Sequence, residues 1–145
     1  MKAIEILRKV RDFYNIPGNL PAYDTELKAC KYYMSDNQRC AVGCLLEPKQ
    51  AKELQDKVGQ KAFTNILSKT FIHPQAWIIQ NLLLELIPED MSEHEGKEFI
   101  ADLQAVHDDE SRNFVKGETT NFGTCLYNRM LLMYPHLQPD QVQSE

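Results

Sequence analysis

The sequence predicts a mainly α-helical protein, a compact single-domain bundle of five to seven helices with a short β-hairpin near residues 29–40. Three observations support this prediction. Apolar side chains recur at three- and four-residue spacing in several segments, and proline, glycine or capping residues separate these segments. The chain has 145 residues and 43% hydrophobic content, which suits one domain. We expect that domain over residues 1–135, followed by a polar C-terminal tail over 136–145.

The opening segment predicts a helix over residues 3–14, because its apolar side chains lie on one helical face: Ile4, Leu7, Val10 and either Phe13 or Tyr14. Pro17 and Gly18 then favour a connecting loop over residues 15–24. Residues 27–34 fit a short strand or a helical turn, and we favour a short extended segment because of the tyrosines at 32 and 33.

Two short helices are predicted next. Residues 35–38 are typical of a turn, and a helix begins near Arg39 or Cys40. Pro48 suits the first turn of a second helix, which ends at Gly59 and is half exposed. A further helical turn is expected over residues 62–67.

The most apolar segment covers residues 75–87. Pro74 suits its first helical position and Pro88 ends it. Apolar residues lie on nearly every side of this helix, Trp77 among them. A helix of this kind is normally surrounded by others, and we expect it in the core.

Two longer helices complete the prediction. Ser92 and Glu95 form a capping-box pattern, so a helix should run from there to about His107. Asp108 and Asp109 are expected to leave that helix, because their charge opposes the dipole at its end. The last helix begins after Thr120 or Asn121 and ends at Pro135.

Charge and composition exclude several classes of function. The net charge of −5 and the pI near 5.4 provide no basic field for general nucleic-acid binding, and a basic protein surface is a better partner. The first residues lack the apolar run of a secretion signal, and the longest apolar stretch is too short to span a bilayer. We therefore expect a cytoplasmic chain without membrane contact, whose four cysteines are reduced thiols or metal ligands.

The segment from Arg39 to Leu46 places two thiols, Cys40 and Cys44, about one helical turn apart with Gly43 between them. One interpretation is that both thiols are small core hydrophobes. A second is catalytic: Cys40, in a first helical turn, is the nucleophile, His107 its base and Asp108 the residue that orients the base.

A third interpretation is a structural zinc site formed by Cys30, Cys40, Cys44 and His107. These ligand types suit zinc, but their spacing differs from that of recognised zinc motifs. We expect no cofactor, and zinc is the only alternative that the residues suggest. His107 also lies on the apolar stripe of its helix, where packing or capping explains it equally well.

A longer pattern joins these residues. Cys30-x-Tyr32, the segment Arg39-Cys40-Ala41-Val42-Gly43-Cys44-Leu45-Leu46 and Leu103-Gln104-x-x-His107-Asp108 follow in order. The chain thus resembles a family of small uncharacterised proteins found largely in tailed-phage genomes, which implies a phage or prophage origin and the cytoplasm of a host cell. It departs from the family pattern at Tyr33, at Glu47-Pro48 and by lacking a tryptophan after His107-Asp108.

The expected function is that of a small phage-encoded accessory protein which binds a host protein or a small ligand, as in host takeover or counter-defence. Arg39, Gly43 and Tyr32 are the candidate ligand-binding residues. The alternatives are a cysteine-dependent hydrolase or transferase and a structural zinc module. The chain lacks the glycine-rich phosphate loop, serine-nucleophile and His-Glu-x-x-His motifs, which favours a binding protein over an enzyme. The sequence does not set the oligomeric state.

Overall fold

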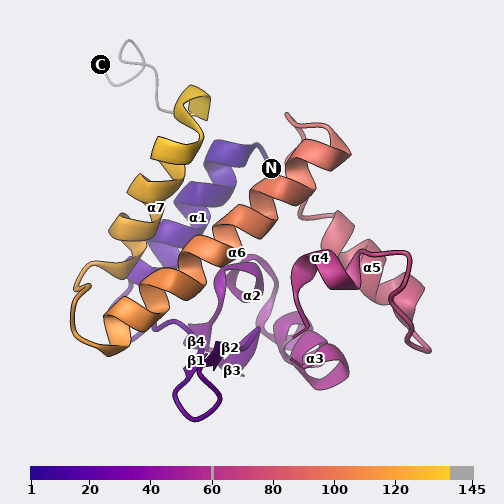
Figure 1. Ribbon diagram of the computed structural model, residues 1–145, viewed down its shortest axis with the longest axis horizontal. Coiled ribbons are helices and arrows are strands. Elements are labelled where there is room, and N and C mark those ends of the chain that lie inside the picture. The colour runs from indigo at the N-terminus through magenta and orange to yellow at the C-terminus, as the bar shows by residue number, and fades with distance from the viewer. Residues whose placement is uncertain (60, 138–145) are drawn as a thin grey trace.

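The computed structural model describes residues 1–59 and 61–137, and it confirms the mainly helical fold. Seven α-helices lie in the described residues (Figure 1): α1 (Ala3–Asn15), α2 (Ala41–Leu45), α3 (Pro48–Val58), α4 (Phe63–Ile66), α5 (Ala76–Leu84), α6 (Glu93–Val115) and α7 (Phe122–Met133). The strands are β1 (Tyr23–Asp24), β2 (Ala29–Cys30), β3 (Tyr33–Ser35) and β4 (Gln38–Arg39), and a 3-10 turn, η1, covers Pro135–Leu137.

Helix α7 packs against both α1 and α6, and the three helices form one part of the molecule, with the strands at one end (Figure 1). Leu7, Val10 and Tyr14 of the predicted apolar face of α1 are buried, whereas Ile4 is only partly buried and Ile6, outside the predicted face, is at 1% exposure. Gly123 allows α7 to approach α1 closely, because a Cβ at this position would lie 2.6 Å from the Arg11 carbonyl oxygen. The first and last helices of the chain thus share one packed interface.

Two antiparallel hairpins precede α2. The predicted hairpin is confirmed as β3–β4, and a second one, β1–β2, begins inside the segment expected to be a loop and pairs Tyr23 with Cys30. Cys40 directly follows β4 and is the N-cap of α2, where its Sγ accepts a hydrogen bond from the Gly43 amide at 3.3 Å. The hairpins therefore bring Cys30 and Cys40 to the start of α2.

Helix α6 is eight residues longer than predicted, so the expectation that Asp108 and Asp109 leave it is wrong. Ser92 caps its first turn by accepting a hydrogen bond from the Glu95 amide. Arg129 on α7 binds Asp109 at 2.7 Å and Glu110 at 2.6 Å. Because this guanidinium and Arg112 compensate the acidic run, the helix continues to Val115.

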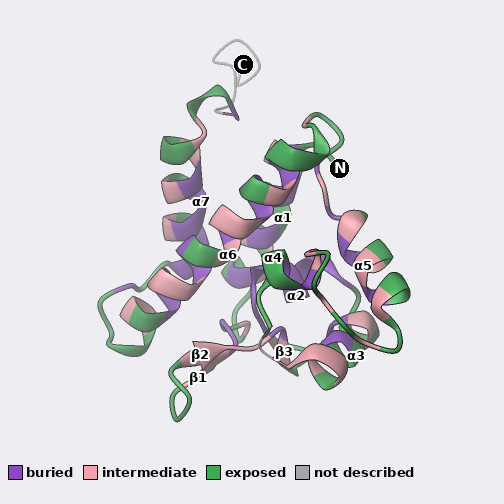
Figure 2. Cartoon of the chain, turned by 45° about the vertical axis from the view of Figure 1, so that its right-hand side comes forward, coloured by how far each residue is buried: buried purple, intermediate pink, exposed green. Residues whose placement is uncertain are grey.

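The composition of α5 predicts a helix surrounded by others, and the structure shows that this prediction is wrong. It begins at Ala76, two residues after Pro74, and lies at the edge of the molecule, where it packs against α4 (Figure 2). Ile79 and Leu83 face the core, whereas Trp77 is 76% exposed and Ile78 is 54% exposed. Ile72, just before the helix, is 93% exposed. One face of this apolar helix therefore lies open to solvent.

The structure continues a little beyond the predicted end of the domain. Pro135 ends α7 as expected, but η1 follows it and Leu137 is buried. The remainder of the predicted tail, residues 138–145, lies outside the described residues. The single helical domain over 1–135 stays a prediction.

Candidate functional site

His107 and Asp108 lie well inside α6, where their side chains meet. His107 is completely buried, and its Nδ1 lies 3.1 Å from Asp108 Oδ1. The Gln104 amide, one turn earlier, donates to the same carboxylate oxygen at 2.8 Å and accepts a hydrogen bond from the Val42 amide of α2. Gln104 therefore holds the carboxylate of Asp108 in place and joins α6 to α2.

Cys30 on β2 places a thiol near this carboxylate, although the two residues are far apart in sequence. One ligand atom each from Cys30, His107 and Asp108 lies within 4.8 Å of the others. Burial raises the pKa of the Cys30 thiol, and the negative charge of Asp108 raises it further. The thiol is thus the stable form of Cys30 beside an ionised Asp108.

Asp108 keeps its charge despite its position. Partial burial alone would raise the pKa of its carboxyl group, but the interactions with His107 and the hydrogen bonds from Cys30 and Gln104 together outweigh burial, and the pKa falls below its ordinary value. The other nitrogen of His107, Nε2, is buried without a hydrogen-bond partner among the described residues. Its ring packs against Tyr14 and Phe122, at centroid distances of 5.8 and 5.3 Å.

Cys40 and Cys44 are both buried, at 1% and 4% exposure. Burial raises the pKa of the Cys40 thiol to about 12, and the nearby charge of Asp108 acts in the same direction. The Cys44 thiol donates a hydrogen bond to the Ala41 carbonyl oxygen. These surroundings favour protonated thiols, as expected of core cysteines, and oppose a nucleophilic Cys40.

We expect the Cys40 thiol to react with iodoacetamide near pH 7 only when the chain unfolds. In the folded chain the reagent cannot reach this buried thiol, and the thiol stays protonated. Peptide mass spectrometry of the protein alkylated with and without urea measures this. Rapid modification of Cys40 in the folded chain would contradict the prediction and support the cysteine-enzyme hypothesis.

Of the four residues named as possible zinc ligands, the structure places Cys30 and His107 in one group together with Asp108. Cys40 and Cys44 are not members of this group. The predicted Cys40–His107–Asp108 catalytic set is brought together in part, since Cys40 and Asp108 line one small cavity but His107 does not line it.

The three predicted ligand-binding residues have structural roles. The buried Arg39 guanidinium donates to the carbonyl oxygens of Gly43 and Leu46 at the end of α2 and stacks on Phe13. Gly43 lets the Tyr32 backbone approach, because a Cβ there would lie 1.9 Å from the Tyr32 carbonyl oxygen. Arg39 and Gly43 therefore hold the hairpin against α2.

Tyr32 also lies beside a small cavity at the site. Its hydroxyl group donates to the Lys61 carbonyl oxygen, and its side chain lines a cavity of about 100 Å³. The other lining residues are Cys30, Lys31, Cys40, Lys61, Ala62, Gln104 and Asp108. Several residues of the sequence pattern that runs from Cys30 to Asp108 thus meet around one small cavity. The sequence prediction did not include Gln104 among the site residues. Its position one helical turn before Asp108 is the signal that indicates a contact between the two side chains.

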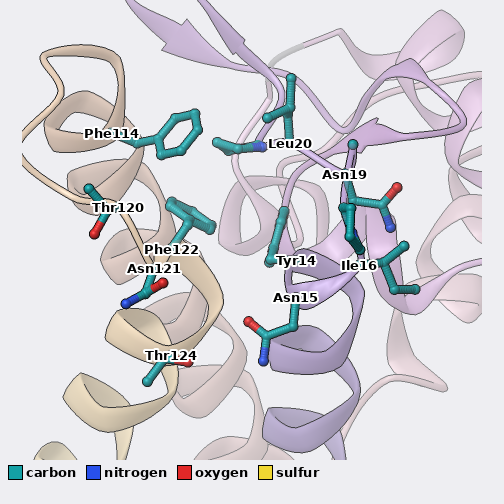
Figure 3. A pocket seen from close by; sticks show the side chains of 13 residues that line it. Tyr14, Asn15, Ile16, Asn19, Leu20, Phe114, Thr120, Asn121, Phe122 and Thr124 are labelled. Atoms are coloured by element: carbon teal, nitrogen blue, oxygen red, sulfur yellow. The ribbon is translucent and has the colours of Figure 1, made fainter.

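A larger cavity, of about 570 Å³, lies between the end of α1 and the start of α7 (Figure 3). Its lining combines aromatic rings with amide and hydroxyl side chains, including Asn15, Asn121 and Thr124, and no charged side chain from the described residues lines it. Tyr14 and Phe122 line this cavity and also contact His107. The rings that pack against the histidine therefore form part of the wall of this larger cavity.

Comparison of the chain with protein-family models, with curated proteins and with solved structures finds no match. Within the described part of the chain, none of the helices has the length and apolar composition required to cross a membrane.

Proposed function

We propose that this protein acts by binding another protein through the exposed face of α5, as a phage-encoded accessory protein would bind a host target. The observation that carries the proposal is the exposure of Trp77, whose side chain is 76% accessible. The chain has no other tryptophan. Tryptophan is costly to leave in water and is enriched among the residues that dominate protein interfaces.

Two further large apolar side chains near Trp77 in sequence are exposed. Ile72 and Ile78 are 93% and 54% exposed, so three large apolar side chains within seven residues face solvent. Single exposed apolar residues are common, but a group of them in one segment indicates an interaction site. The net charge of −5 favours a partner whose apolar pocket is surrounded by basic residues.

A catalytic function is less well supported. The thiol proposed as nucleophile is buried and has a raised pKa, and the histidine proposed as its base is completely buried and packed against aromatic rings. Both features favour packing over proton transfer to a substrate. Host takeover and counter-defence are the roles that the resemblance to phage proteins suggests for such a binding protein.

Affinity capture from a bacterial host lysate, followed by titration of the recovered partner, tests the proposal. We expect Trp77→Ala to weaken binding about 30-fold or more, the change that corresponds to the loss of a dominant interface residue. The fluorescence of the single tryptophan should shift when the partner binds the wild-type chain. Higher salt should weaken binding if the partner is basic.

Leu132→Ala is the matched control. Leu132 lies on α7 and is 77% exposed, so its substitution removes a similarly accessible apolar side chain elsewhere. A partner that binds Trp77→Ala as tightly as wild type would contradict the proposal. Sedimentation velocity gives a second contrary outcome, namely a dimer that Trp77→Ala dissociates, since the face would then join two copies of this chain.

A further inference from the structure

Cys30, His107 and Asp108 form a group that packing alone does not explain. The three side chains come from β2 and α6, more than seventy residues apart in sequence, yet their ligand atoms lie within 4.8 Å of one another. A thiol, an imidazole and a carboxylate are each established ligands of divalent transition metals. The group lies apart from the exposed face of α5.

We propose that the chain binds one divalent transition-metal ion of the zinc type through Cys30 Sγ, His107 Nδ1 and a carboxylate oxygen of Asp108. Calcium and magnesium prefer oxygen ligands, whereas the sulphur and nitrogen atoms here suit Zn²⁺ or Co²⁺. The three ligands leave one tetrahedral position unfilled, as in zinc sites that also bind water or substrate.

The distance between the two α6 ligands fits this proposal. Nδ1 of His107 and Oδ1 of Asp108 lie 3.1 Å apart. Two ligands at zinc distances of about 2.0–2.1 Å and tetrahedral angles are separated by roughly 3.3 Å. The consecutive residues therefore need little movement to bind the same ion.

The surroundings also hold the ligands in position. Gln104 donates to Asp108 Oδ1 at 2.8 Å and is itself fixed by the Val42 amide. Hydrogen bonds of this kind orient ligating carboxylates in metal sites. Cys30 and Asp108 line the cavity of about 100 Å³, which has room for water at the fourth position and gives the ion a path from solvent.

The protons balance in a simple way. Binding of the ion to Cys30 replaces the thiol hydrogen, which leaves to solvent, so this ligand releases one proton for each ion bound. Nδ1 of His107 must also give up the hydrogen that it donates to Asp108: a neutral ring then carries its hydrogen on Nε2 instead, and a protonated ring releases a second proton to solvent. Asp108 binds the ion as a carboxylate, the form that it already has without the ion.

Titration of the untagged, reduced chain with Co²⁺ tests the proposal directly. We expect one ion per chain, with the visible absorption of a tetrahedral site and a near-ultraviolet charge-transfer band from the thiolate, both lost on addition of Zn²⁺. Calorimetry of Zn²⁺ binding in buffers of different ionisation enthalpy should show between one and two protons released per ion, one from Cys30 and the remainder from His107. Absence of the charge-transfer band at excess Co²⁺ would overturn the proposal.

Matched variants identify the ligands. Loss of a hydrogen bond to a metal ligand weakens metal binding about 10–100-fold, so loss of a ligand itself, in Cys30→Ser or Asp108→Asn, should weaken it by more than about 100-fold. Cys125→Ser is the control, because Cys125 lies on α7 outside the cluster. Circular dichroism checks that the variants fold. Ions that bind equally well to folded Cys30→Ser and Asp108→Asn would show that the site lies elsewhere and would overturn the proposal.

Discussion

Gly43→Ala should destabilise the folded chain by about 3 kcal/mol or more. A Cβ at residue 43 would lie 1.9 Å from the carbonyl oxygen of Tyr32 and 3.0 Å from its carbonyl carbon. Both atoms belong to the backbone, so the clash cannot be relieved by rotation of a side chain. The segment before β3 must move away from α2, at a cost in the upper range of overpacking substitutions or beyond it. The higher helix propensity of alanine recovers only about 1 kcal/mol.

Urea denaturation followed by circular dichroism measures this loss. Lys49→Ala provides the control, because Lys49 is exposed on α3 and its removal should change the free energy of unfolding by less than about 0.5 kcal/mol. Tyr32 is two residues from Cys30, so any folded fraction of Gly43→Ala should also bind Co²⁺ more weakly. Wild-type stability in Gly43→Ala would show that the hairpin and α2 are not in the contact described above.

Gly123→Val should have the next largest effect, a loss of about 3 kcal/mol. A Cβ at residue 123 would lie 2.6 Å from the Arg11 carbonyl oxygen and 3.1 Å from Tyr14 Cβ. The two further methyl groups of valine would force α7 away from α1 and uncover apolar surface that both helices bury. Valine thus adds bulk at the position where the two helices are closest.

Thr124→Val is the control that shows whether a valine in this part of α7 is by itself destabilising. It introduces the same side chain one residue later, at an exposed position of the same helix. We expect its denaturation midpoint to match that of wild type within experimental error, while that of Gly123→Val falls. Equal midpoints for the two variants would be inconsistent with the close approach of α1 and α7.

Local patterns predicted much of the fold correctly. The apolar spacing of α1, the proline at the start of α3 and the proline after α7 are short-range signals that depend on neighbouring residues. The length of α6 could not be predicted in this way. The residue that neutralises Asp109 is Arg129, twenty positions later and on another helix. A rule about helix ends cannot include a charge that only the tertiary structure supplies.

The candidate site, like the fold, could be predicted from local sequence only in part. Cys30, His107 and Asp108 were all recognised as chemically interesting, but they were divided between a catalytic and a zinc hypothesis. Their proximity depends on the β1–β2 hairpin, a two-residue pairing within a segment that looked like a loop. Likewise, composition predicted a buried α5, because it reports how apolar a helix is but not how many neighbours cover it.

The pairing of α1 with α7 determines when the protein can finish folding during its synthesis. The first helix leaves the ribosome early, but its partner is the last long helix to be made. At about 5–20 residues per second, the nascent chain carries the apolar side of α1 without this partner for roughly ten seconds. Early release of the chain, before residue 133, would therefore leave that surface available to chaperones and proteases.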